Sequence, residues 1–222
     1  MQIYKVGVDS LSIGPLSSKL KSSLYVGPTL WLVSGGSNIH IASAVMQNID
    51  IELSRNLTVA LADERFGPYG HPDSNWTQLK EAGFDPKQAR VIEVLTQTSA
   101  DLEATTKNYA EALSSAMYDV NTFIGQFGMG SDGHIAGILP HSPASEEHLE
   151  LAIGYKSDPY TRITVTFECI RHLNSAFLNV FGESKREQIE KLINQNLPLN
   201  EQPAQIIKQV GESYVYNDQL GG

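Results

Sequence analysis

Short apolar runs recur along the chain and alternate with segments that have helical periodicity. Continuous apolar runs are typical of parallel strands buried on both faces of a sheet. The pattern predicts such strands at residues 29–33, 57–62, 90–95, 122–127 and 176–181, an alternating strand at 162–167 and a short last strand at 214–216. A sheet of mainly parallel strands is therefore expected.

Helices are predicted between these strands, at residues 39–46, at 74–82, from Thr98 onward and behind Ser184. Asp101 follows Thr98 by three residues in a weak capping-box pattern, and Ser184 forms a capping box with Glu187. The repeated order of strand, loop and helix predicts an α/β fold, in which a largely parallel sheet carries helices on both faces.

The chain has 222 residues, which suits one domain over residues 1–222. Its 41% hydrophobic and 18% charged residues are ordinary for a folded globular protein. In sheets of this kind, ligands bind beyond the carboxyl ends of the strands. The segment 140–159 is rich in Pro, Ser and Glu, and predicts a long surface excursion near such a site.

The first polar cluster at a predicted strand end is Ser34-Gly35-Gly36-Ser37. Its glycines would let the backbone approach a ligand closely, and the N-terminus of the following helix favours an anion such as phosphate. A tight turn with Ser37 as helix N-cap would explain the same residues without a ligand. No Gly-Lys-Ser/Thr follows, so the segment is not a Walker loop.

The second cluster, Asp63-Glu64-Arg65, follows the next apolar run. Three consecutive charges often form a solvated turn. Alternatively, an acid and a guanidinium face a ligand here, with Arg65 binding a phosphate or carboxylate through two hydrogen bonds. Arg162 and Lys185 also stand close to predicted strands, although each on its own is typical of a surface cation.

The third cluster is the most informative and has the sequence Gly128-Met129-Gly130-Ser131-Asp132-Gly133-His134. Its glycines permit tight backbone geometry after a strand. Asp132 lies two residues before His134, and a carboxylate near an imidazole can set its tautomer and raise its basicity, as a general base requires. The glycine spacing does not match the dinucleotide-binding fingerprint.

Composition and missing motifs disfavour several classes of function. The formal net charge of −9 disfavours nucleic acid and anionic membranes as partners. Cys169 is the single cysteine, and no Cys/His spacing predicts a metal site. No Gly-x-Ser-x-Gly or His-Glu-x-x-His motif is present, which disfavours a covalent serine mechanism and a zinc hydrolase. Neither a signal peptide nor an apolar stretch of about 20 residues is apparent, so we expect a cytoplasmic protein.

The three clusters occur in order with Ser74-Asn75, Leu139-Pro140, Arg162-Ile163-Thr164, and Gly182 with Lys185. Together they resemble the 6-phosphogluconolactonase family, a branch of the superfamily that includes glucosamine-6-phosphate deaminase. The resemblance runs from about Thr29 to Asp218. It implies a modified Rossmann-like α/β fold and no metal or organic cofactor. It also implies hydrolysis of 6-phospho-D-glucono-1,5-lactone to 6-phosphogluconate, in the oxidative pentose phosphate pathway.

The resemblance assigns roles to individual residues as well. His134 would be the general base that activates water, and Asp132 would support it. Arg65 would contact either the phosphate or the lactone end of the substrate. The residues expected to bind the substrate and its phosphate are Ser34, Gly35, Gly36, Ser37, Asp63, Asn75, Arg162 and Lys185.

Two other functions remain open at this point. Deaminases of the superfamily have a glutamate just before the loop proline and a tyrosine after Asp-Glu, whereas this chain has Leu139 and Arg65. A sugar-phosphate-binding sensor module would need the phosphate contacts but not the base His134. The chain also departs from the lactonase pattern, with Asn38-Ile39 in place of Thr-Pro and Gly137-Ile138-Leu139 in place of Ser-Leu-Phe.

Overall fold

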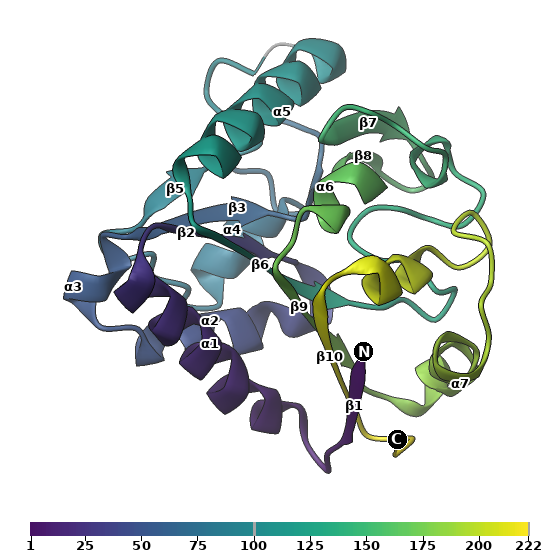
Figure 1. Ribbon diagram of the computed structural model, residues 1–222. Helices are drawn as coiled ribbons and strands as arrows, with labels where there is room; N and C mark the ends of the chain where they lie inside the picture. The colour runs from purple at the N-terminus through teal and green to yellow at the C-terminus, as the bar shows by residue number, and fades with distance from the viewer. Residues whose placement is uncertain (100, 222) are drawn as a thin grey trace.

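The computed structural model describes residues 1–99 and 101–221. Its centre is a seven-stranded sheet (Figure 1) in which every pair of neighbouring strands is parallel. In order across the sheet, the strands are β1 (Gln2–Lys5), β10 (Glu212–Asn217), β9 (Ser175–Val180), β6 (Thr122–Gly128), β2 (Thr29–Val33), β3 (Leu57–Leu61) and β5 (Arg90–Ile92). The first strand of the chain therefore pairs with the last.

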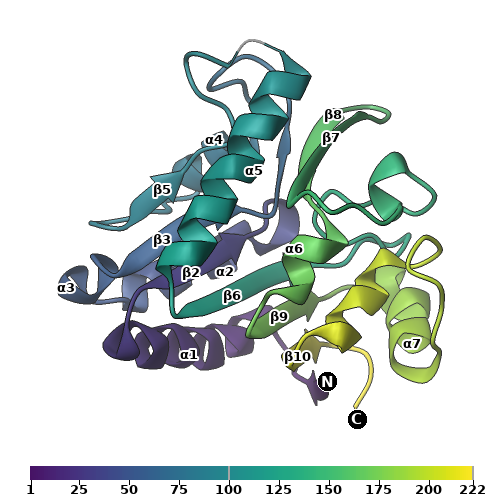
Figure 2. The same ribbon diagram turned by 45° about the horizontal axis from the view of Figure 1, so that its top comes forward.

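Helices cover both faces of this sheet, and Figure 2 shows α1 on one face with α5 and α6 on the other. The α-helices are α1 (Ile13–Val26), α2 (Ile39–Asn48), α3 (Ile51–Ser54), α4 (Asn75–Glu81), α5 (Leu102–Asp119), α6 (Phe167–Arg171) and α7 (Arg186–Asn194). Short 3₁₀ turns are η1 (Asp9–Ser12), η2 (Gly36–Asn38), η3 (Pro143–Ser145), η4 (Glu183–Lys185) and η5 (Pro203–Gln209). The predicted α/β fold is thus confirmed. None of the helices in the described ranges is long and apolar enough to cross a membrane.

The continuous apolar runs form the buried centre of the sheet, as predicted. All five residues of β2 are buried, since helices cover the sheet on both sides. Strands β3 and β6 lie beside β2 and are nearly as buried, and all six residues of β9, one strand further away, are buried. Their carboxyl ends lie at one edge of the sheet, and the polar clusters follow directly from them.

A second sheet of three antiparallel strands was not predicted. It consists of β4 (Asp63–Arg65), β8 (Thr161–Val165) and β7 (Ala152–Lys156). Ala62 joins the two sheets, because its N–H donates to Val33 at 2.8 Å and its carbonyl accepts from Val165 at 2.9 Å. The residues Asp63–Arg65 are therefore a strand of their own rather than the end of the preceding one.

Three further details differ from the predictions. Helix α5 begins at Leu102 and not near Thr98, because the Asp101 carboxylate accepts the backbone N–H of Ala104 at 2.8 Å and is itself the N-cap. Helix α7 has Lys185 at its N-cap, and Ser184 lies inside the preceding 3₁₀ turn. The predicted surface excursion at 140–159 is only partly irregular, since it includes β7.

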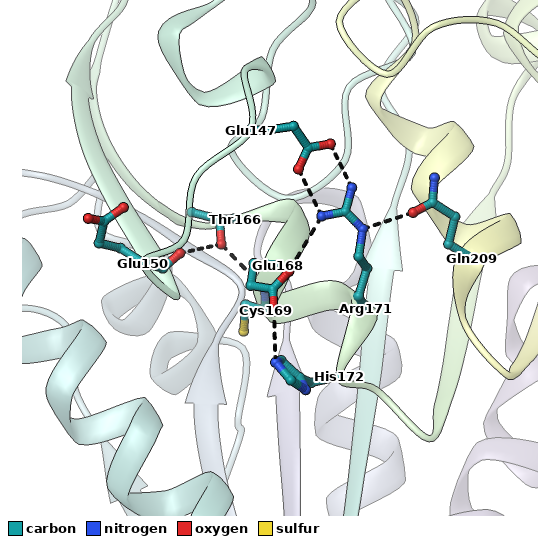
Figure 3. A network of polar contacts seen from close by, with 8 residues as sticks. All are labelled: Glu147, Glu150, Thr166, Glu168, Cys169, Arg171, His172 and Gln209. Atoms are coloured by element: carbon teal, nitrogen blue, oxygen red, sulfur yellow. Dashed lines mark hydrogen bonds and ion pairs between the residues drawn. The ribbon is translucent and has the colours of Figure 1, made fainter.

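The irregular part of that excursion is anchored by a polar network around helix α6 (Figure 3). The Arg171 guanidinium donates two hydrogen bonds to Glu147, at 2.6 and 2.8 Å, and one to Gln209 at 2.9 Å. Thr166 donates its hydroxyl to the Glu150 carbonyl at 2.6 Å, and the same hydroxyl accepts the N–H of Cys169. These contacts connect the segment before β7 to the helix that follows β8.

Candidate active site

The predicted site residues meet in one cavity beyond the carboxyl ends of β2, β3 and β6. Its volume is about 230 Å³, smaller than the ~300–1,000 Å³ typical for drug-sized ligands. The cavity is lined by Ser34, Gly35, Gly36, Ser37, Asn38, Asp63, Arg65, Asn75, Gly128, Met129, Gly130, His134, Ala136, Arg162 and Lys185. Of the site residues predicted from sequence, Asp132 alone is not part of this lining. It forms a hydrogen bond with His134, which does line the cavity.

The Ser34–Ser37 loop packs closely against the start of α4. A side chain at Gly35 would collide with the carboxamide of Asn75, and Gly36 has a φ of +67° that favours glycine. Ser37 is not the N-cap of α2, since it lies within η2 and Asn38 takes the cap position. The Ser34 hydroxyl is buried without a hydrogen-bond partner among the described residues, which leaves it available to a ligand.

Glu64 organises this side of the cavity, although sequence reasoning gave it no role. Its buried carboxylate accepts the hydroxyl of Ser74 at 2.8 Å and the N–H groups of Asn75 and Trp76 at 2.6 and 3.1 Å. It also accepts the N–H of Arg65 at 2.8 Å. Burial raises the pKa of the Glu64 carboxyl, against the opposing effect of these four hydrogen bonds. The carboxylate thereby ties β4 to the N-terminus of α4.

Arg65 and Arg162 stand opposite each other on neighbouring strands. They are register partners on β4 and β8, and both line the cavity. The Arg65 guanidinium donates to the Asp73 carbonyl at 3.1 Å, and that of Arg162 donates to the Ser157 hydroxyl at 3.1 Å. Within residues 1–99 and 101–221, neither of them forms an ion pair with a carboxylate.

The loop after β6 holds the imidazole and carboxylate together. His134 Nδ1 lies 2.7 Å from Asp132 Oδ1, and the same oxygen accepts the His134 backbone N–H at 3.1 Å. A side chain at Gly130 would overlap both groups, and Gly133 has a φ of +89°, so the turn depends on glycine at these positions. With Nδ1 facing Asp132, His134 Nε2 is the nitrogen left to accept a proton.

Two opposing effects act on Asp132. Partial burial acts to raise the pKa of this carboxyl, but the hydrogen bonds and the charge of His134 outweigh it, so that pKa lies below its ordinary value. The carboxylate is therefore ionised at neutral pH. An ionised partner stabilises an imidazolium and so supports a histidine that takes up a proton.

Lys185 enters the cavity from η4, behind β9. It is half-buried, and this burial lowers the pKa of its ammonium, while the charge of Asp218 acts in the opposite direction. Asp218 also accepts the N–H of Gly182. The cavity thus contains three cationic side chains against one carboxylate, Asp63. In a chain of net charge −9, this local excess of positive charge favours a small anion.

A larger cavity of about 780 Å³ lies between α5 and β7. Its lining is mainly apolar, and none of the predicted site residues belongs to it. Size alone therefore does not select between the two cavities, whereas the convergence of cations and a His–Asp pair makes the smaller cavity the candidate active site. Across residues 1–99 and 101–221, no group of three His, Cys, Asp or Glu side chains is placed to hold a metal ion.

Comparison with known proteins identifies the family of this chain. The family model described as glucosamine-6-phosphate isomerases/6-phosphogluconolactonase matches residues 25–216. The chain belongs to this family. A relative named 6-phosphogluconolactonase, from Neisseria meningitidis, is 27% identical over 185 residues, which cover 78% of this chain and 79% of that protein. Membership confirms the resemblance seen in the sequence.

Solved structures of the family confirm the fold. A 6-phosphogluconolactonase from Shewanella baltica OS155 superposes with a TM-score of 0.82 at 21% identity, over 98% of this chain and 97% of the other. A monomeric glucosamine-6-phosphate deaminase superposes with a TM-score of 0.75 at 18% identity, over 98% and 97%. Because both enzymes share the fold, the fold alone does not distinguish lactonase from deaminase.

Sequence reasoning missed Asn38 and Ala136, which also line the cavity. Asn38 donates from its side chain to the Asn179 carbonyl at 3.5 Å, and its own carbonyl accepts from Gln126 at 3.2 Å. In the sequence, Asn38 stands out only as a departure from the family pattern. Its position next to the Ser34–Ser37 loop is a signal that could have marked it.

Proposed function

We propose that this chain hydrolyses 6-phospho-D-glucono-1,5-lactone to 6-phosphogluconate, in the oxidative pentose phosphate pathway. The observation that carries the proposal is the His134–Asp132 pair at 2.7 Å on the wall of a small cavity that also holds Arg65, Arg162 and Lys185. A phosphorylated lactone needs such a combination, namely a base for the attacking water and cations for the phosphate. The names of the relatives support the same substrate.

In the proposed mechanism, His134 Nε2 takes a proton from a water molecule as the water oxygen forms a bond to the lactone carbonyl carbon. The carbonyl oxygen becomes an oxyanion in the tetrahedral intermediate. When the carbonyl re-forms, the bond between this carbon and the ring oxygen breaks. The ring oxygen receives the proton from His134 and becomes a hydroxyl, so the net reaction consumes one water and opens the ring. Asp132 stabilises the imidazolium between these two steps.

The remaining residues bind the substrate. The Ser34–Ser37 loop, Arg162 and Lys185 bind the phosphate. Arg65 lies beside them and also contacts the substrate. Asp63 and Asn75 contact the sugar. Anchoring the distant phosphate holds the lactone carbonyl next to His134, which lowers the entropic cost of the reaction. An electrophilic lactone needs little more than a positioned base and donors for the oxyanion, which fits a cavity without a catalytic serine motif.

The test is hydrolysis of freshly prepared 6-phosphogluconolactone, with spontaneous hydrolysis subtracted. We expect clear activity for the wild type and a loss of about 10²-fold or more for His134→Ala, the scale of a lost general base. His148→Ala is the matched control, because His148 is half-buried, contacts the Pro143 carbonyl and lies outside the candidate active-site cavity.

Each alternative function has its own outcome in this test. Release of ammonia from glucosamine-6-phosphate, with no lactonase activity, would establish a deaminase. Tight binding of sugar phosphates without turnover of either substrate would establish a sensor module. Equal lactonase rates for the wild type and His134→Ala would refute the role of His134 as the general base but would still support the proposed substrate.

A further inference from the structure

The ring of Tyr160 lies against both cavity arginines. The guanidinium carbon of Arg65 is 5.2 Å from the centroid of this ring, and that of Arg162 is 5.6 Å away. Both distances are within the ~6 Å range of cation–π attraction. Tyr160 itself is not among the residues that line the cavity, whereas both arginines are, so the two guanidinium groups connect its ring to the site.

Tyr160 is held in place by the turn between β7 and β8. Ser157 donates both its backbone N–H, at 3.0 Å, and its hydroxyl, at 2.6 Å, to the carbonyl of Tyr160. The same hydroxyl accepts the Nε–H of Arg162 at 3.1 Å. One serine thus connects the backbone of Tyr160 to the side chain of Arg162.

The aromatic face of Tyr160 offsets the repulsion between the two positively charged arginines. Like charges on register partners of antiparallel strands repel each other. Arg65 and Arg162 are such partners, and within residues 1–99 and 101–221 neither forms an ion pair with a carboxylate. An ion pair with a carboxylate would fix the two guanidinium groups in place, but it would also neutralise their positive charge. The negative face of an aromatic ring attracts both guanidiniums without forming a hydrogen bond to them, so it occupies none of the N–H groups that remain for an incoming anion.

We propose that Tyr160 is a positioning residue that orients Arg65 and Arg162 as one receptor for the substrate phosphate, and so sets the affinity for phosphorylated ligands. The inference rests on the proposed function for the identity of the substrate. It also assigns Arg65 to the phosphate rather than to the lactone end.

The test compares Tyr160→Phe, which keeps the ring, with Tyr160→Leu, which removes it. Two lost cation–π contacts predict a KM for 6-phosphogluconolactone about tenfold higher in Tyr160→Leu, with kcat nearly unchanged, and wild-type values in Tyr160→Phe. Hydrolysis of unphosphorylated glucono-1,5-lactone should be alike in all three proteins. A fall in kcat at unchanged KM, or an equal loss with both lactones, would overturn the proposal.

A second series keeps the shape of the side chain and therefore does not depend on how well Tyr160→Leu folds. Phenylalanine with an increasing number of ring fluorines at position 160 weakens the negative face of the ring in steps. The affinity for 6-phosphogluconate, measured by calorimetry, should fall with each step. An affinity that does not change with fluorination would overturn the inference. This binding measurement needs no turnover, so it separates failure of the Tyr160 proposal from failure of the lactonase proposal.

Discussion

Replacing Asp132 by asparagine tests the coupling between this side chain and His134. Asparagine has the same shape and can still accept the Nδ1–H of His134, but it has no charge to stabilise the imidazolium. A hydrogen bond to a charged group contributes about 1.5–3 kcal/mol. The side chains of His134 and Asp132 are 35% and 50% exposed, so solvent screening places the effect near the lower end of this range.

About 1.5 kcal/mol corresponds to a roughly tenfold lower kcat for Asp132→Asn. The imidazolium forms only as the reaction proceeds, so kcat and kcat/KM should fall together while KM stays constant. Steady-state hydrolysis of the lactone measures both. The matched control is Ser131→Ala, an exposed neighbour in the same loop, which should retain wild-type kinetics.

Two results would refute this reasoning. Wild-type kinetics in Asp132→Asn would show that the carboxylate charge has no part in the reaction. A loss as large as that of His134→Ala would show that Asp132 maintains the structure of the loop and does more than assist the base. In that second case the melting temperature of the variant should also be lower, which a thermal denaturation experiment would detect.

Two other substitutions test the framework around the site. Arg171→Leu removes the contacts of Arg171 shown in Figure 3 and should lower the free energy of unfolding by about 1 kcal/mol, since the ion pair with Glu147 is partly exposed. The hydrogen bond from Arg171 lowers the pKa of Glu147 in the folded protein. This stabilisation is therefore complete above the ordinary carboxyl pKa and is lost as the pH falls through the lowered value; denaturant titrations in acid that still show the full difference would contradict it. Gly137→Ser restores the usual family residue, yet a Cβ at this position would lie 2.9 Å from the Thr164 Cβ and 3.1 Å from the Asp63 Cβ. We expect a loss of about 1–3 kcal/mol from overpacking, whereas Gly14→Ala, in open space on α1, should not destabilise; unchanged melting temperatures for both would show that Thr164 moves aside.

The central sheet could be predicted because most of its strands are buried on both faces, and such burial leaves continuous apolar runs in the sequence. Residues 30–33 are apolar without interruption, and strand β2 extends over this whole run. The edge strand β1 has mostly exposed side chains and no apolar pattern, so nothing in its sequence marked it. Strand β7 was missed for a similar reason, since exposed and half-buried residues dominate it.

The site shows the same division between what the sequence contains and what folding adds. Clusters that follow buried parallel strands must meet at one edge of the sheet, so the convergence of His134, Arg65 and the Ser34–Ser37 loop could be predicted. The role of Glu64 as a buried hydrogen-bond acceptor could not be predicted, because its partners Ser74 to Trp76 reach it only when α4 packs beside β4. Tyr160 lies in an irregular turn, and its stacking depends on the register of β4 and β8, which no local pattern specifies.

The pairing of β1 with β10 has a consequence for how the chain is made. The neighbour of β1 in the sheet is the strand that begins at Glu212, so the residues of β1 leave the ribosome long before those of the strand with which they pair. The carbonyl of Asn217 then accepts the N–H of Val6 at 2.8 Å and extends the pairing of β1 with β10 by one hydrogen bond. Vectorial synthesis would thus complete the edge of the sheet last.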